Sequence, residues 1–160
     1  MPFPTLFKPL IPSPSILDEQ IANMAAPITC HVLNTVSGTP ASGLEATLTL
    51  LTPSPTKSGN VSGEHPWVRF RAVTNEDGRV KEWEPTPANS KTLDEVMSEF
   101  KDGERTSWSI KFEVGPWYEQ RNIESFWPDV EVKFYVKKGE RHYHVPVLVG
   151  PWTYTTYRGS

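Results

Sequence analysis

The sequence contains a single cysteine, Cys30, so it can form no internal disulfide and offers no cysteine pair for a zinc site. One thiol suits a reducing compartment. No apolar run approaches the roughly 20 residues that span a bilayer, and no basic run accompanies the formal net charge of −3. Glycine-rich phosphate loops and Gly-x-Ser-x-Gly nucleophile motifs are also missing. We therefore expect a chain without a membrane span and without a nucleic-acid partner.

The remaining composition is that of an ordinary globular protein. Apolar residues make up 37%, charged residues 22% and aromatic residues 11% of the 160 residues, which fits one domain with a full core. Prolines concentrate at the start, where six of the 16 lie within the first 27 residues. They rule out a regular helix or a central strand there. We therefore predict a disordered extension over residues 1–26 and a single domain over residues 27–160.

Alternating polar and apolar residues predict several short strands. A Ser/Pro/Gly-rich loop is expected over residues 52–66 and an Asp-Gly turn over residues 75–80. The only good helix signal covers residues 92–103, where Thr92 can cap the helix and Glu95 follows three residues later. Short strands with frequent turns and one short helix indicate an all-β sandwich, with strands expected over residues 44–52, 67–74, 108–114, 129–136, 143–149 and 152–158.

The histidines are the first candidates for chemistry. His142 and His144 lie two residues apart in a predicted strand and so share a face. Such a pair can bind a metal, but no further cysteine or suitably spaced carboxylate accompanies it, so a metal site is the weaker interpretation. His31 lies in a short apolar strand, where a lone histidine is typically structural. Its neighbour Cys30 cannot act with it as a dyad, because adjacent strand residues point to opposite faces, and Cys30 fits a small core residue.

Arg79 follows the Asp-Gly turn and begins a strand. Taken alone, such an arginine is typical of a solvated surface charge. The residue pattern therefore predicts a sandwich with scattered histidines and arginines, and does not by itself bring them together.

Three separated segments carry a family resemblance. They are "HVLNTVSGTPASGLEATL" (31–48), "NEDGRVKEWEP" (75–85) and "HYHVPVLVGPWTYTTYRGS" (142–160). In this order they resemble the 5-hydroxyisourate hydrolases, relatives of the hormone carrier transthyretin, and the resemblance covers roughly residues 28–160. The most specific motif is Tyr157-Arg158-Gly159-Ser160, which distinguishes these hydrolases from true transthyretins.

The resemblance implies a transthyretin-like β-sandwich of two four-stranded sheets with one short helix. It implies a homotetramer, a dimer of dimers with active sites at the dimer–dimer interface. It also implies catalytic roles for His31, Arg79 and His144, without metal or organic cofactor. Substrate binding falls on the terminal motif, at Tyr157, Arg158 and Ser160.

The implied reaction is hydrolysis of 5-hydroxyisourate to 2-oxo-4-hydroxy-4-carboxy-5-ureidoimidazoline in urate degradation. Neutral imidazole, with a pKa of about 6.5 in solution, suits the activation of water. We expect His31 and His144 to hold and deprotonate that water, and which of them is the base stays open. Arg79 offers forked, permanently charged donors to the developing oxyanion or to the anionic ring. Ser160 can bind the substrate through its hydroxyl or its α-carboxylate.

Two other functions remain as alternatives. One is a non-enzymatic, transthyretin-like carrier of a small aromatic ligand, and the other is an interaction module whose Trp-rich surface binds protein. Arg79 and the motif at residues 157–160 argue against the carrier. The expected location is the cytoplasm. Peroxisomal import is the alternative, although Arg-Gly-Ser is not a Ser-Lys-Leu address.

Overall fold

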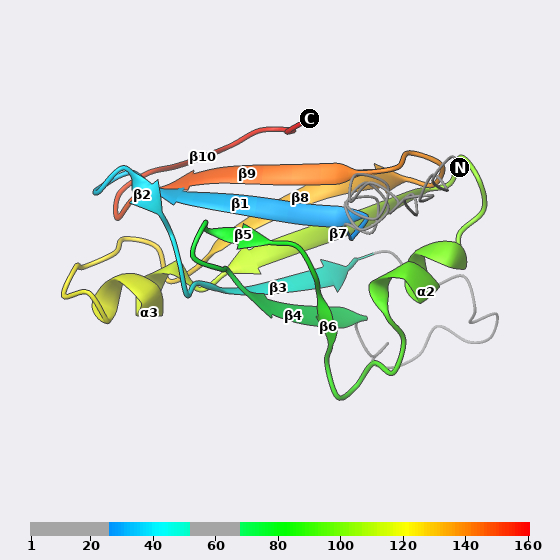
Figure 1. Cartoon of the computed structure of the whole chain (residues 1–160), viewed down its shortest axis with the longest axis horizontal. Coiled ribbons are helices and arrows are strands. Elements are labelled where there is room, and N and C mark those ends of the chain that lie inside the picture. The colour runs from blue at the N-terminus through cyan, green and yellow to red at the C-terminus, as the bar shows by residue number, and fades with distance from the viewer. Residues whose placement is uncertain (1–25, 52–67) are drawn as a thin grey trace, which may run out of the picture.

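A computed structural model describes residues 26–51 and 68–160 as a sandwich of two β-sheets (Figure 1). The predicted extension before the domain and the predicted loop at residues 52–66 lie outside the described residues. In chain order the strands are β1 (Ile28–Asn34), β2 (Thr39–Pro40), β3 (Glu45–Leu50), β4 (Arg69–Val73), β5 (Arg79–Val80), β6 (Glu84–Pro85), β7 (Arg105–Phe112), β8 (Val130–Lys137), β9 (Tyr143–Val149) and β10 (Tyr154–Thr156).

The first sheet has the order β10-β9-β1-β2, with β5 also paired to β1, and the second has the order β6-β4-β3-β7-β8. The predicted all-β sandwich is confirmed. The count of four strands per sheet is wrong, because each described sheet has five strands. Three of these ten strands, β2, β5 and β6, are only two residues long and cannot show an alternating pattern in the sequence.

One pairing in the first sheet joins distant parts of the chain. β1 and β9 run parallel, with Thr29 opposite His144 and His31 opposite Pro146. The other strand pairs in both sheets are antiparallel. Parallel neighbours require a long crossover connection, and here the second sheet is built between β1 and β9. The N-terminal strand therefore lies beside the segment that carries the last two histidines.

Alternation decides which residues of these strands enter the core. In β1, Cys30 and Val32 are buried between the sheets, while His31 is only partly buried on the opposite face. Cys30 is 1% exposed, which confirms it as a small core residue. Burial raises the pKa of its thiol to about 12, so it is not a thiolate near neutral pH.

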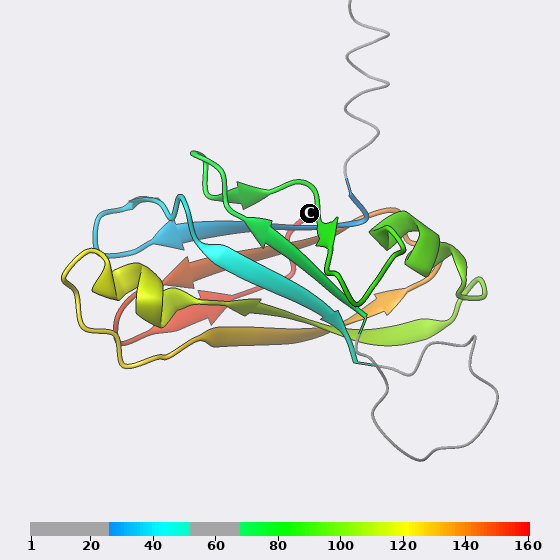
Figure 2. The ribbon, with the colours of Figure 1, turned by 90° about the horizontal axis from the view of Figure 1, so that it is seen from below.

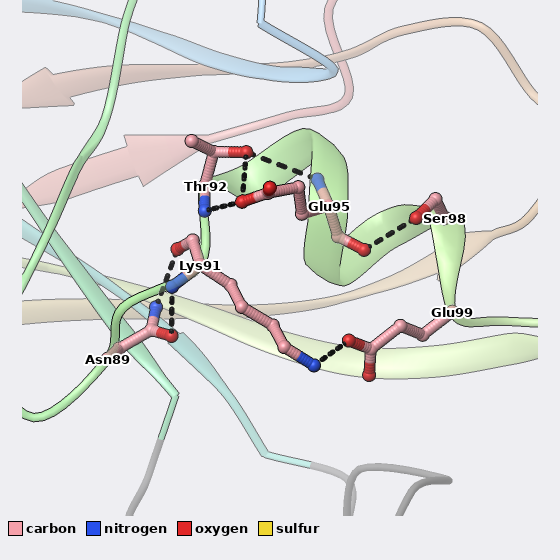
Figure 3. Close-up of polar contacts among 6 residues, drawn as sticks. All are labelled: Asn89, Lys91, Thr92, Glu95, Ser98 and Glu99. Atoms are coloured by element: carbon pink, nitrogen blue, oxygen red, sulfur yellow. Dashed lines mark hydrogen bonds and ion pairs between the residues drawn. The ribbon is translucent and has the colours of Figure 1, made fainter.

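The predicted helix is confirmed but shorter, as α2 (Leu93–Ser98). Figure 3 shows its capping box: Thr92 Oγ1 accepts from the Glu95 amide at 3.3 Å, and Glu95 Oε2 accepts from the Thr92 amide at 2.7 Å. Lys91 and Glu99 form an ion pair beside it. The helix ends before Gly103, which lies in a turn and donates its amide to Lys138 at 3.0 Å.

A second helix, α3 (Val114–Glu119), was not predicted. Its Pro116 lies in the first turn, where a helix needs no amide donor, so proline is tolerated there. The buried Tyr118 hydroxyl lies 2.8 Å from Asn34 Oδ1 and 3.0 Å from the Val149 carbonyl oxygen, which ties the ends of β1 and β9 together. Figure 2 shows α2 and α3 at opposite ends of the sandwich. Within residues 26–51 and 68–160, neither helix is long and apolar enough to cross a membrane.

Candidate active site

Three residues from distant segments share the outer face of the first sheet. His31 on β1 lies directly opposite Arg79 on β5. Thr29, two residues before His31 and on the same face, lies opposite His144 on β9. The structure therefore brings His31, Arg79 and His144 together, although the two histidines lie 113 positions apart in sequence.

A tight turn delivers Arg79 to this face. The side-chain oxygen of Asn75 accepts the amides of Asp77 at 3.0 Å and Arg79 at 2.9 Å. Gly78 has φ of +70° and donates its amide to the Asn75 carbonyl at 2.9 Å. A Cβ on Gly78 would lie 2.3 Å from the Val32 carbonyl oxygen, so only glycine lets the turn approach β1 this closely. The predicted Asp-Gly turn is confirmed, and it crosses from the second sheet to the first.

The C-terminal segment lies against His144. β10 pairs with β9, and beyond it the Gly159 amide donates to the His144 carbonyl at 2.9 Å. Figure 1 shows the chain end running back along β9. A Cβ on Gly159 would lie 2.6 Å from Cδ2 of the His144 ring and 3.0 Å from Pro146 Cγ. Gly159 therefore allows the segment to pack directly against the ring.

The other residues of the terminal motif are placed differently. Tyr157 and Ser160 are exposed to solvent next to the segment that contacts His144. Arg158 donates to Glu140 Oε2 at 2.6 Å, and its guanidinium lies 5.2 Å from the centroid of the Tyr143 ring. These contacts hold Arg158 at the β8–β9 turn. Substrate binding by Tyr157, Arg158 and Ser160 stays a prediction.

A threonine that the sequence did not single out contacts both late histidines. Thr29 Oγ1 lies 2.8 Å from His144 Nδ1 and 3.1 Å from His142 Nε2. The His142 and His144 rings are nearly parallel, with centroids 6.2 Å apart. The period of two in β1 puts Thr29 on the His31 face, but only the β1–β9 register reveals its partners.

Burial and charge lower the pKa of both His31 and His144, so each imidazole stays neutral down to a lower pH than an ordinary histidine. Burial, followed by the charge of Arg79, holds the pKa of His31 below its ordinary value, and Asp77 partly opposes this. Burial is also the largest cause of the lowered pKa of His144, and Arg79, His142 and His31 add to it. A histidine that is neutral near neutral pH can accept a proton. The site therefore combines neutral bases with a permanent cation.

A metal ion held by His142 and His144 would need further protein ligands. Among the described residues, no group of three His, Cys, Asp or Glu side chains is placed to hold a metal ion. The nitrogens of His142 and His144 that face Thr29 are used in hydrogen bonds to its hydroxyl.

A separate groove of about 1360 Å³ lies on the outer face of the second sheet. Its floor carries Arg69, Arg71 and Lys111, and carboxylates surround them. None of the three clustered site residues lines it. We place the candidate active site on the first sheet because the groups that can transfer a proton gather there.

Comparisons with known proteins agree with this arrangement. The sequence model of the HIUase/Transthyretin family matches residues 28–159. The probable 5-hydroxyisourate hydrolase of Schizosaccharomyces pombe is 37% identical over 135 residues, covering 83% of this chain and 90% of the relative. The 5-hydroxyisourate hydrolase of Mus musculus is 37% identical over 141 residues, covering 88% and 100%. The structure of Klebsiella pneumoniae 5-hydroxyisourate hydrolase is similar with a TM-score of 0.56 and 25% identity, covering 83% of this chain and 97% of that one.

We predict that Arg79→Met raises the pKa of both His31 and His144. The guanidinium disfavours the imidazolium forms, so its removal makes protonation easier and the titration moves to higher pH. The measurement is an NMR titration of the imidazole protons in the full-length protein. Arg79→Lys keeps the charge and serves as the matched control, with pKa values close to those of the wild type. Unchanged histidine titrations in Arg79→Met would contradict the electrostatic coupling.

Proposed function

The chain belongs to the HIUase/transthyretin family, and on that premise we propose that it hydrolyses 5-hydroxyisourate to 2-oxo-4-hydroxy-4-carboxy-5-ureidoimidazoline. The observation that carries the proposal is the clustering of His31, Arg79 and His144 on one sheet face. The curated relatives that bear this activity in their names support it. The chemistry needs no metal or organic cofactor. The cytoplasm, with the peroxisome as the alternative, stays a prediction for the compartment.

The histidines supply the base for water. In the proposed reaction the water oxygen bonds to the carbonyl carbon of the amide-like C–N bond, and an imidazole takes one water proton. The C–N bond then breaks, and the imidazolium returns the proton to the leaving nitrogen, which opens the ring. The lowered pKa values of His31 and His144 support this role, because they keep the imidazoles neutral and ready to accept a proton.

Arg79 supplies the positive charge. Attack by water places negative charge on the carbonyl oxygen, and a guanidinium fixed nearby stabilises that charge before the reaction begins. The turn at residues 75–78 fixes the backbone of Arg79 opposite His31. The fork of N–H donors can hold an oxyanion through two hydrogen bonds, whereas a lysine offers a point charge. We assign oxyanion stabilisation to Arg79 and substrate binding to the motif at Tyr157–Ser160.

We also propose that the chain assembles as a homotetramer. Phe126 and Trp152 are 64% and 68% exposed, and their ring centroids lie 6.1 Å apart. Trp127 and Tyr154 extend the cluster, with ring centroids 5.2 Å apart. This cluster lies next to β10, the strand at one end of the first sheet. Exposed aromatic clusters beside an open sheet edge are typical of surfaces that another subunit covers.

We predict that the wild-type protein accelerates the decay of freshly generated 5-hydroxyisourate. The substrate is made with urate oxidase, and its ultraviolet absorbance is followed with and without the protein. Arg79→Lys should lose about 100-fold in kcat/KM, the typical effect of losing one oxyanion donor.

Arg71→Lys is the matched control for that assay, because Arg71 lies on the other sheet. It should behave as the wild type. If 5-hydroxyisourate decays no faster with the wild-type protein than without it, the proposed function is overturned and the carrier is favoured. Full activity in Arg79→Lys would instead remove only the role of Arg79.

A second prediction concerns the segment that packs on His144. Gly159→Ala should lower kcat/KM by about 100-fold, because displacing a catalytic group by about 1 Å has effects of this size and the new methyl group overlaps the His144 ring. Gly139→Ala is the control, since a Cβ there meets nothing within 4 Å. It should lower stability and leave kcat/KM unchanged. Equal activity of the two variants would mean that the segment does not position His144.

The assembly has its own test. The wild type should sediment at about 72 kDa, four times the 18.1 kDa chain, and the double variant Phe126→Ser/Trp152→Ser should sediment as smaller species. Val73→Ser, an exposed apolar residue on the second sheet, is the control and should keep the wild-type mass. A wild type that sediments at the mass of one chain would refute the tetramer.

A further inference from the structure

Thr29 lies between the two late histidines and is itself nearly inaccessible. Its side-chain oxygen is within hydrogen-bonding distance of His144 Nδ1 at 2.8 Å and of His142 Nε2 at 3.1 Å. The residue is only 7% exposed, whereas His142 is exposed to solvent. The β1–β9 register fixes its backbone directly opposite His144. Both the backbone and the oxygen of Thr29 are thus fixed relative to the His144 ring.

A hydroxyl group carries one proton, and this limits how the three groups can be arranged. Thr29 can donate to one imidazole nitrogen while it accepts from the other. If Thr29 donates to His144 Nδ1, then the proton of neutral His144 lies on Nε2. If Thr29 accepts from His144 Nδ1, its own proton points to His142 Nε2 and leaves His144 Nε2 with a free lone pair. The direction of the two hydrogen bonds of Thr29 therefore selects the tautomer of His144.

We propose that Thr29 is a positioning residue that accepts from Nδ1–H of His144 and donates to Nε2 of His142, so that Nε2 of His144 is the base of the reaction. This inference rests on the proposed hydrolase function. Nδ1 of His144 is already used by Thr29, so a proton taken from water can be received only at Nε2. Nε2 must then be unprotonated in the resting site, and the proton of Thr29 must point to His142.

The same hydrogen bonds also stabilise the protonated state of His144. When His144 Nε2 takes the water proton, the ring becomes an imidazolium whose Nδ1–H still donates to Thr29. Hydrogen bonds to a charged group are stronger than those to a neutral one, so the contact gains strength as the charge develops. Thr29 continues to donate to Nε2 of His142. His31 is left to orient the water, and Arg79 opposite it keeps the role of stabilising the oxyanion.

The tautomer is measured directly on the wild-type protein. Two-bond ¹H–¹⁵N correlation spectra above the titration range of the histidines distinguish protonated from unprotonated ring nitrogens. We expect His144 to show a protonated Nδ1 and an unprotonated Nε2, and His142 to show an unprotonated Nε2. A protonated Nε2 on His144 would overturn the proposal.

Two substitutions complete the test. Thr29→Val removes the hydroxyl at nearly constant volume, and Thr29→Ser keeps it. Thr29→Val should lower kcat by about 10- to 100-fold, the usual effect of losing a hydrogen bond to a charged group, with KM changed by less than about twofold. It should also lose the single tautomer of His144. Thr29→Ser should restore both the rate and the tautomer.

The outcomes separate this inference from the function itself. If the wild type does not hydrolyse 5-hydroxyisourate, the function fails, and the spectra still decide the tautomer. If the wild type is active and folded Thr29→Val keeps its kcat, the function stands and the role of Thr29 is refuted. A rise in KM alone would also refute it, because that would indicate a role in binding. Circular dichroism and sedimentation establish that each variant is folded and assembled.

Discussion

The parallel pairing of β1 with β9 is the constraint on which the rest of this structure depends. It sets Thr29 against His144 and joins the first and last long strands of the domain. The hydrogen bonds of Thr29 require it, because they join β1 to histidines at the start of β9. Parallel strands need a long connection, and here that connection is the whole second sheet. The candidate active site is therefore a product of the complete fold and not of any local motif.

The positive charge of Arg79 acts on both histidines and on the reaction. Burial first, and then the Arg79 cation directly opposite His31, lower the pKa of both His31 and His144, so these imidazoles stay neutral where solvent-exposed histidines would begin to protonate. The same cation can stabilise the negative charge that a neutral base helps to create. The Arg79 side chain thus helps to keep the base neutral and can also stabilise the negative charge that forms. Its position depends on Gly78, because a side chain at that position would push the turn away from β1.

The sequence predicted those parts of the fold that have a local cause. Alternation gave the long strands, and the Thr92 capping box gave α2. The sequence did not predict α3, because Gly115 and Pro116 are poor helix formers and the helix is only six residues long. The two-residue strands have no period to detect. Pairing between β1 and β9 leaves no signature in one sequence, so the site was expected only through family resemblance, and Thr29 was missed.

The alternation that stabilises the sandwich also specifies the site. On β9, Val145 and Val147 are buried in the core, so His144 must face outward. A slip of one residue in β9 would expose these valines and bury the His144 imidazole without a partner, which costs several kcal/mol in an apolar environment. Burial of the core residues therefore keeps Thr29 and His144 on the outer face, and the pairing of β1 with β9 sets them opposite each other. In this protein the hydrophobic effect decides which face the catalytic residues occupy, and strand pairing decides which of them meet.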